Sequence, residues 1–257
     1  MALKSLGAVY PDLEGKSVIV TGGGSGIGAA IVRAFVRQKA KVGFIDIAEA
    51  PSAALVQELG GDKAGVSFAK ADIRDIGALK SAIAALAGAL GGADILINNA
   101  GHDERHAALE VTPEMFDELI AVNLRHAFFA AQAVLPGMIT KGGGVILNFS
   151  SISWMAGMGG MPVYTAAKSA MLGLTRSLAR DFGAHNIRVN AIAPGWVRTE
   201  RQVAKWLTPE SDKQRLDAQC LKRWVEPEDI AGFCVFLASD DASACTAQHY
   251  VVDAGWV

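Results

Sequence analysis

Cysteine is scarce in this sequence, where only Cys220, Cys234 and Cys245 occur. Their odd number and the absence of a CxxC pair argue against a disulfide framework, so we expect reduced thiols in a cytoplasmic protein. Basic runs are also missing and the net charge is −2, which argues against a nucleic-acid-binding surface. We further expect neither a secretory signal nor a membrane span, because no run combines the required length and apolarity.

Charge is also sparse, since Asp, Glu, Lys and Arg make up 19% of the chain, below the usual quarter. So few charges indicate that part of the surface is buried again in an oligomer. The 51% of apolar residues and the 28 glycines fit a sizeable core with many tight turns. The sequence shows no linker, repeat or low-complexity segment, so we expect a single domain over residues 1–257.

Short apolar runs recur along the chain, and stretches with helical spacing lie between most of them. The runs lack polar alternation, which is typical of strands covered on both faces of a sheet. This pattern predicts an α/β fold with one doubly wound parallel sheet and helices on both faces. The expected strands are residues 17–20, 41–46, 65–70, 94–98, 144–150, 187–194 and 249–255, and the helices include residues 27–38, 78–90, 113–139 and 164–182.

A glycine-rich turn, "TGGGSGIG" from Thr21 to Gly28, joins the first expected strand to the first expected helix. Glycines let a backbone approach a pyrophosphate, and a helix N-terminus offers unpaired N–H groups. Asp46 ends the second strand, where a carboxylate binds an adenosine ribose and repels a 2′-phosphate. No Arg or Lys follows Asp46 directly, so the sequence favours NAD over NADP. The alternative for Asp46 is a strand-end acid that caps the next turn.

Two further strand ends bring polar residues to the expected cleft, because ligands bind beyond the carboxyl ends of the strands in such a sheet. Asp72 follows the third strand and suits hydrogen bonding at an adenine edge, or alternatively caps the next helix. The sequence "NNAG", from Asn98 to Gly101, closes the fourth strand. Its amides are placed to brace the neighbouring strand and line the cleft.

The segment "VYTAAK" puts Tyr164 and Lys168 on one helical face, because residues at i and i+4 are neighbours there. A free phenol has a pKa of about 10, and lowering it to about 7 takes roughly 4 kcal/mol. One cation about 4 Å away, at an effective dielectric near 20, supplies that much before desolvation is subtracted. We therefore interpret Tyr164 as a general base that Lys168 makes more acidic, with the positive nicotinamide of bound NAD⁺ as a second cation. The alternative is a packed Tyr beside a Lys that extends its charged end to solvent.

Together these motifs resemble the short-chain dehydrogenase/reductase family. The motifs occur in the order and approximate spacing of that family, from about Lys16 to Trp256. They are "TGGGSGIG", "NNAG", Asn123 in "VNLRH", Ser151, "YTAAK" and "PGWVRT". The resemblance implies a Rossmann fold of about seven parallel strands, a nicotinamide cofactor and a homotetramer built on the long helices that flank the fifth strand. Segments such as "NAGHDERH" and "NFSSISW" are most similar to bacterial NAD-dependent sugar dehydrogenases of the D-xylose dehydrogenase type.

The resemblance implies roles by position. Ser151 holds the substrate oxygen, with Ser150 as the competing assignment, and Asn123 holds a water that relays protons from Lys168. An Asn exposed on a helix surface is the alternative for Asn123. The catalytic set is Asn123, Ser151, Tyr164 and Lys168. The implied cofactor-binding residues are Gly22, Ser25, Gly26, Ile27, Gly28, Asp46, Asp72, Ile73, Asn99, Ala100, Gly101, Tyr164, Lys168, Pro194, Gly195, Val197 and Thr199.

We place a cofactor half over about residues 16–110 and a catalytic and substrate half over about 111–257. Substrate is expected beside residues 102–106, the methionine-containing loop 153–163, and a mobile lid over about 199–220. The first segment is polar and suits a hydroxyl-rich substrate, whereas the second is pliable and apolar. The expected substrate residues are Asp103, Ser151, Ser153, Trp154, Tyr164, Trp196 and Trp206.

The sequence therefore predicts an NAD-dependent oxidoreductase that acts on a sugar or a sugar-derived alcohol as its small-molecule substrate. One alternative is an enzyme for apolar secondary alcohols or ketones, of the steroid or ketoacyl type. Another is a non-catalytic protein that senses dinucleotides, because a fold alone does not establish activity. No metal site is expected, since His102 and His106 have i, i+4 spacing but no third ligand. The remaining residues His126, His185 and His249 are interpreted as packing or surface residues.

Overall fold

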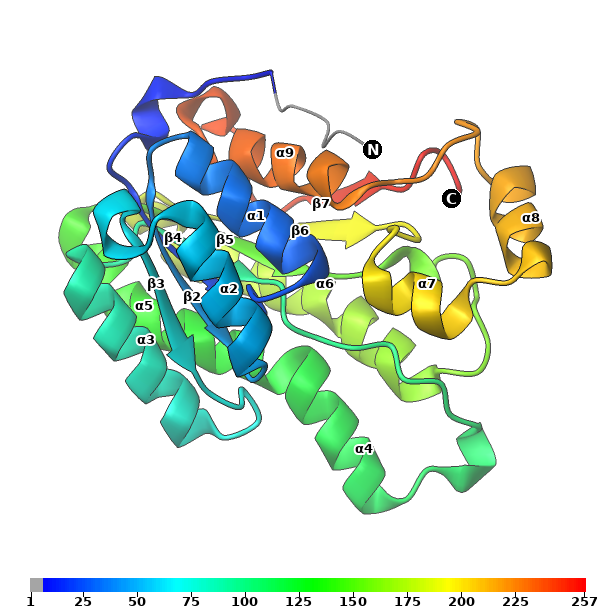
Figure 1. Cartoon of the computed structure of the whole chain (residues 1–257). Helices are drawn as coiled ribbons and strands as arrows, with labels where there is room; N and C mark the ends of the chain where they lie inside the picture. The colour runs from blue at the N-terminus through cyan, green and yellow to red at the C-terminus, as the bar shows by residue number, and fades with distance from the viewer. Residues whose placement is uncertain (1–6) are drawn as a thin grey trace.

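The computed structural model describes residues 7–257, so residues 1–6 of the predicted domain lie outside the described part. Seven parallel strands form one sheet in the order β3-β2-β1-β4-β5-β6-β7 (Figure 1). The predicted parallel sheet is confirmed, and the strand bounds agree to one residue except that β7 ends earlier than expected. The strands are β1 Ser17–Thr21, β2 Lys41–Asp46, β3 Val66–Lys70, β4 Ile95–Asn98, β5 Gly144–Phe149, β6 Ile187–Pro194 and β7 His249–Val252.

Helices cover both faces of this sheet (Figure 1). Successive strand residues alternate between two apolar clusters, as Val18 and Ile19 do, because side chains on a strand point to opposite faces. One cluster lies beneath α1 (Gly26–Arg37), α2 (Glu49–Leu59) and α9 (Pro227–Ala238). The other lies beneath α3 (Ile76–Leu90), α5 (His126–Lys141) and α6 (Pro162–Phe182). Burial on both faces explains why the strands read as continuous apolar runs.

The helix predicted over residues 113–139 is divided in the structure. α4 covers Pro113–Ile120, a π-helical turn covers Ala121–Arg125, and α5 follows directly. Single π-helical turns are rare and occur frequently at functional sites. This one contains Asn123, so the irregularity coincides with a predicted catalytic residue.

The run Pro113–Lys141 is long and apolar enough to cross a membrane, contrary to the expectation that no run combines these properties. Half of its most apolar stretch is buried inside the protein. α5 packs against α3, and α4 packs against α6. Core helices pass the same length and composition test, and this packing is that of a core helix.

The predicted lid over residues 199–220 contains two short helices, α7 (Glu200–Trp206) and α8 (Pro209–Ala218). Figure 1 shows both beyond the carboxyl end of β6, outside the two helical layers. Thr199 and Thr208 begin the two helices, and each side chain accepts a backbone N–H bond from the first turn. The lid is therefore structured as capped helices that stand over the strand ends.

A chain of buried amides joins β4, β5 and α6 below the site. The Nδ2 of Asn98 donates to the Oδ1 of Asn148 at 2.9 Å, and the Nδ2 of Asn148 donates to Thr175 Oγ1 at 3.0 Å. Asn148→Leu removes both of these buried bonds and leaves Asn98 Nδ2 with only its 3.3 Å bond to the carbonyl of Ala127, so we expect the free energy of unfolding to fall by about 2–4 kcal/mol. Urea unfolding at fixed protein concentration measures this. Gln57→Leu, on the exposed side of α2, is the control, and an equal effect in both variants would contradict the prediction.

Candidate active site

A cavity of about 930 Å³ opens at the carboxyl ends of the strands. Every residue predicted to bind the cofactor lines it, and so do all the predicted substrate residues except Trp154. Of the four predicted catalytic residues, Ser151, Tyr164 and Lys168 line the cavity, while Asn123 lies just behind its wall. Segments far apart in the sequence therefore meet at one place.

Trp154 lies outside this cavity, so its predicted substrate contact is corrected. Its indole N–H donates to Ser150 Oγ at 3.3 Å, and its ring centroid is 6.0 Å from that of His249. The short 3-10 turn after β5 directs the side chain toward β7, and Trp154 is a packing residue.

The glycine turn after β1 is close-packed. A β-carbon on Gly28 would lie 1.8 Å from the carbonyl oxygen of Gly22, and Gly22 itself has φ of +68°. The Nδ2 of Asn99 donates to the carbonyls of Thr21 and Gly22 at 3.1 and 2.9 Å, so the predicted bracing by "NNAG" is present. The first residues of α1 face the cavity, and their N–H groups have no partner within the helix. The turn is thus an anion cradle of the kind that a pyrophosphate fits.

Asp46 serves the turn and the cavity together. Its Oδ2 accepts the N–H of Gly24 and its Oδ1 accepts the N–H of Ala48, each at 2.9 Å. The capping role left open by the sequence is therefore present. The carboxylate also lines the cavity, and each oxygen keeps a second lone pair for a ligand hydroxyl.

The helix-capping alternative for Asp72 is wrong. Asp75 begins α3, and its side chain accepts the N–H of Ala78 at 3.0 Å. Asp72 instead accepts the N–H of Arg74 at 2.9 Å and pairs with the Arg74 guanidinium, which lowers the pKa of the Asp72 carboxyl. It lines the cavity as an ion-paired acceptor.

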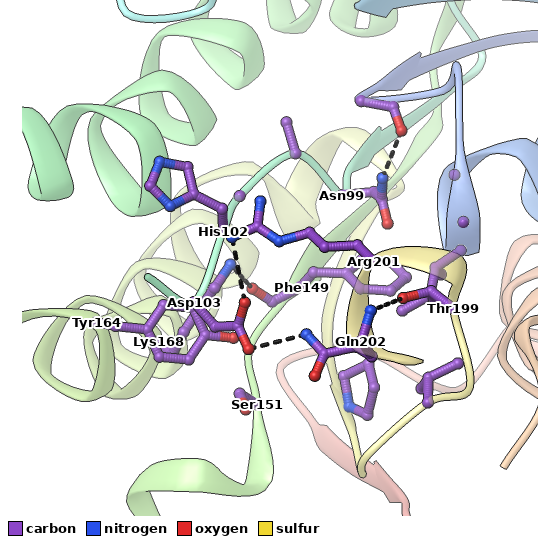
Figure 2. A pocket seen from close by; sticks show the side chains of 18 of the residues that line it. Asn99, His102, Asp103, Phe149, Ser151, Tyr164, Lys168, Thr199, Arg201 and Gln202 are labelled. Carbon is purple, nitrogen blue, oxygen red and sulfur yellow. Dashed lines mark hydrogen bonds and ion pairs between the residues drawn. The ribbon is translucent and has the colours of Figure 1, made fainter. Parts of the chain in front are cut away.

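Tyr164, Lys168 and Ser151 come together at the N-terminal end of α6 and the end of β5 (Figure 2). Lys168 Nζ donates to the carbonyl oxygen of Phe149 at 3.0 Å and lies 5.8 Å from the centroid of the Tyr164 ring. Only 3% of Lys168 is exposed, so the interpretation of a lysine that extends to solvent is wrong. The ammonium is held inside the site by a backbone carbonyl.

The electrostatics of the protein alone differ from the sequence prediction. Burial raises the pKa of Tyr164 to about 12, and a hydrogen bond with Ser151 offsets only part of that rise. Burial also lowers the pKa of Lys168 to about 8. Because the ammonium points to Phe149 rather than to the phenol oxygen, Lys168 does not by itself bring Tyr164 near neutrality. The effect predicted for Lys168 alone is therefore too large, while the effect of the bound nicotinamide stays a prediction.

The two serines after β5 have different partners. Ser150 Oγ donates to the backbone carbonyl of Lys168 at 2.7 Å and is buried, so it fixes α6 against β5. Ser151 Oγ accepts the N–H of Ser153 at 3.2 Å and hydrogen-bonds Tyr164. The geometry therefore favours Ser151 over Ser150 as the hydroxyl that works beside the phenol.

Asn123 is fully buried, so the alternative of an exposed surface Asn is wrong. Its Oδ1 accepts the N–H of His102 at 3.0 Å, and its Nδ2 donates to the carbonyl of Leu119 at 3.1 Å. A β-carbon added at Gly101 would meet Asn123 Oδ1 at 2.8 Å and Lys168 Nζ at 3.0 Å. Asn123 and Lys168 thus both lie against Gly101, where a larger residue would force these two side chains to shift.

His126 was interpreted as a packing or surface residue, and the structure buries it completely. Burial and the positive charge of Lys168 together lower the pKa of His126 to about 3, so the ring is neutral at physiological pH. His106 is structural, because its Nδ1 is bonded to the carbonyl of Glu104 and its Nε2 to the N–H of Val163. From the sequence, only its position about one helical turn after Asn123 could have indicated that His126 lies near Lys168.

The substrate side of the cavity is closed by contacts between the lid and the loop after β4. Arg201 and Lys205 on α7 pair with Glu104 at 3.2 and 3.1 Å. Gln202, also on α7, donates to Asp103 (Figure 2). Thr199 and Trp196 line the cavity wall between the lid and β6. Their predicted ligand contacts stay predictions.

Comparison with known proteins adds a family to this geometry. Residues 22–257 match the family model described as "Enoyl-(Acyl carrier protein) reductase". The chain is 48% identical to D-xylose 1-dehydrogenase of Caulobacter vibrioides, over 97% of this chain and 98% of the relative. This chain is a short-chain dehydrogenase/reductase. The predicted family and the predicted fold are therefore confirmed.

Two further matches show the range of this family. The dehydrogenase/reductase is 48% identical to a protein named "Probable galactose dehydrogenase" from Rhizobium meliloti, over 96% of each chain. It also superposes with a TM-score of 0.89 on a blue fluorescent protein from a metagenomic library, crystallised in complex with NADPH. That protein is 36% identical, and the match covers 96% of this chain and 99% of the other. A nicotinamide cofactor thus fits the family, and the glycine cradle and Asp46 fit it in this chain.

Proposed function

We propose that this enzyme is an NAD-dependent sugar dehydrogenase, which oxidises a hydroxyl of an aldose or a sugar-derived alcohol. The observation that carries the proposal is the Ser151–Tyr164 pair in a cavity that continues to the glycine cradle. Relatives that are 48% identical and named for xylose and galactose support the substrate class. Sugars are hydroxyl-rich, and the polar loop 102–106 suits them.

The residues divide the work by position. Ser151 donates a hydrogen bond to the substrate oxygen and orients the reacting hydroxyl toward Tyr164. The Tyr164 phenolate takes the hydroxyl proton, while the ammonium of Lys168 and the amide of Asn123 hold the polar groups behind it. When bound, the oxidised nicotinamide supplies the acceptor for the hydride and a positive charge near the phenol. The N-terminus of α1 and the residues Pro194 to Thr199 would hold that cofactor in place.

Asp46 supports NAD rather than NADP, because its carboxylate stands at the end of β2 in the cavity and repels a 2′-phosphate. The blue fluorescent protein shows that NADPH is bound within the family. We expect Asp46→Ala to reduce the NAD-over-NADP ratio of kcat/KM by about 10-fold or more, because the repulsion is lost. Initial rates with both cofactors measure the ratio. An unchanged ratio would place ribose recognition elsewhere.

A second candidate is an enzyme for apolar alcohols or ketones, which Met158 and Met161 in the cavity wall favour. A panel of aldoses, polyols, 3-hydroxyacyl thioesters and steroid alcohols, mixed with enzyme and NAD⁺, distinguishes the two. The proposal predicts NADH formation with an aldose or sugar-derived alcohol. Turnover of the apolar members alone would support the second candidate, and NAD⁺ binding without any turnover would support a dinucleotide sensor.

We also propose a cytoplasmic homotetramer. Phe116 on α4 and Phe128 on α5 are 46% and 44% exposed, and a partner subunit would cover such side chains. Light scattering during gel filtration measures the mass. A single monomer peak at micromolar concentration would overturn the proposed assembly.

A further inference from the structure

The loop after β4 presents a carboxylate on the substrate side of the cavity. The Asp103 side chain is only 17% exposed. Gln202 Nε2 donates to Asp103 Oδ2 at 2.9 Å, and the Arg201 guanidinium lies 3.6 Å from Asp103 Oδ1. Gln202 is itself oriented, because its Oε1 accepts the indole N–H of Trp196 at 2.8 Å. Asp103 is therefore held from the lid in a fixed position (Figure 2).

Asp103 and Tyr164 line the same cavity. After burial, which is the main cause, the negative charge of Asp103 also contributes to the raised pKa of Tyr164. A carboxylate has two oxygens with about four lone-pair sites and no proton to donate. The described contacts leave acceptor sites of the Asp103 carboxylate unused. A ligand group between Asp103 and Tyr164 satisfies these sites by donating hydrogen bonds. A hydroxyl does so, whereas a ketone or an acyl chain does not.

Unpaired donors line the same part of the wall. Arg105 Nε and Trp206 Nε1 are buried and have no hydrogen-bond partner among residues 7–257. The Arg105 guanidinium stands 5.0 Å from the centroid of the Trp206 ring, so the two donors are adjacent, and both residues line the cavity. Buried donors without partners are rare in native proteins and call for an explanation. A ligand hydroxyl can accept a hydrogen bond from Arg105 or Trp206 and donate one to Asp103, so hydroxyl groups satisfy the unpaired donors and the carboxylate together.

We propose that Asp103 is a specificity-determining residue that accepts a hydrogen bond from the substrate hydroxyl next to the reacting carbon. The proposal rests on the proposed sugar dehydrogenase activity and adds the recognised group, which is a pair of adjacent hydroxyls. Trp206 from the lid and Arg105 from the loop after β4 donate to the oxygens of the same substrate. Gln202 and Arg201 are positioning residues, since they act through Asp103. Binding of this diol also places the lid, because Gln202 belongs to α7.

The test compares an aldose with its 2-deoxy analogue, for example D-galactose with 2-deoxy-D-galactose or D-xylose with 2-deoxy-D-xylose, whichever parent the wild type oxidises. We expect the wild type to favour the parent sugar in kcat/KM by about 10- to 100-fold, as for one hydrogen bond to a charged group. In Asp103→Ala this ratio is expected to fall to within about threefold, while the value for the 2-deoxy sugar changes little. Asp103→Asn, which keeps the shape of the side chain, is expected to lower the ratio by a smaller factor.

Glu104→Gln is the matched control. Glu104 is the next residue and also pairs with α7, but it does not line the cavity. We expect its parent-to-deoxy ratio to equal that of the wild type. An unchanged ratio in Asp103→Ala, or an equal loss with both sugars, would overturn the role of Asp103 and leave the sugar dehydrogenase activity intact. A wild type that oxidises no sugar would instead remove the proposed function and this inference with it.

Discussion

Tyr164→Phe is expected to lower kcat by about 10²- to 10⁴-fold, because the variant keeps the ring and loses the phenol proposed to take the substrate proton. The affinity for NAD⁺ is expected to stay within about threefold, since the glycine cradle and Asp46 are untouched. Initial rates of NADH formation with the best sugar of the panel measure the first quantity. Quenching of tryptophan fluorescence by NAD⁺ measures the second.

Tyr10→Phe is the control for this variant, because Tyr10 does not line the cavity and packs against the apolar cluster beneath α1, α2 and α9. It is expected to keep the wild-type kcat. Wild-type rates in Tyr164→Phe would remove the phenol from the mechanism. A parallel loss of NAD⁺ affinity would mean that the ring shapes the cofactor site instead.

Lys168→Met is expected to lower kcat by about 10²- to 10³-fold and also to weaken NAD⁺ binding by about 10-fold. Both effects are expected because the variant removes a buried, positively charged hydrogen-bond donor from the wall of the site. The bond to the Phe149 carbonyl is lost as well, so the loop after β5 is less firmly held. The same rate and fluorescence measurements separate the two effects. Lys168→Met thus differs from Tyr164→Phe in its effect on cofactor affinity.

Lys213→Met is the matched control for Lys168→Met. Lys213 pairs with Asp217 at 2.5 Å on the exposed side of α8, where ion pairs contribute little. Its rate and affinity are expected to match the wild type. If Lys168→Met lowered kcat without changing NAD⁺ affinity, the lysine would act on proton transfer alone, and the proposed double role would be wrong.

Much of the fold could be predicted because its causes are local. Strands buried on both faces must be apolar throughout, and β1 is buried along its whole length, so its run of residues was unambiguous. The glycine turn was predictable for a similar reason, since a β-carbon at Gly28 would collide with the backbone of Gly22. The buried strands and the glycine turn each require particular residue types at fixed positions, which can be recognised in the sequence.

The π-helical turn around Asn123 could not be predicted, because apolar spacing through residues 113–139 is compatible with one straight helix. The turn depends on tertiary packing against Gly101 and α6, which no local pattern records. The packing position of Trp154, outside the cavity, could not be predicted for the same reason. An aromatic residue beside a catalytic serine is equally compatible with a cavity wall and with packing under β7.

The predicted effect of Lys168 on the pKa of Tyr164 was too large, because the direction of the lysine side chain could not be predicted. The i, i+4 spacing places Tyr164 and Lys168 on one face but does not say where the flexible lysine side chain ends. Its ammonium donates to the Phe149 carbonyl, and burial of the site disfavours the phenolate of Tyr164. The sequence contains no signal for either contribution. The positive charge of the bound cofactor, the second cation of the prediction, is then expected to supply the acidity that Lys168 alone does not.

A titration of the Tyr164 phenol tests this central claim directly. The chain has three tyrosines, Tyr10, Tyr164 and Tyr250, so the ultraviolet difference between wild type and Tyr164→Phe reports phenolate at one position. We predict no phenolate signal below about pH 10 in the protein alone, and a midpoint below about pH 9 with saturating NAD⁺. The same midpoint with and without NAD⁺ would contradict the account.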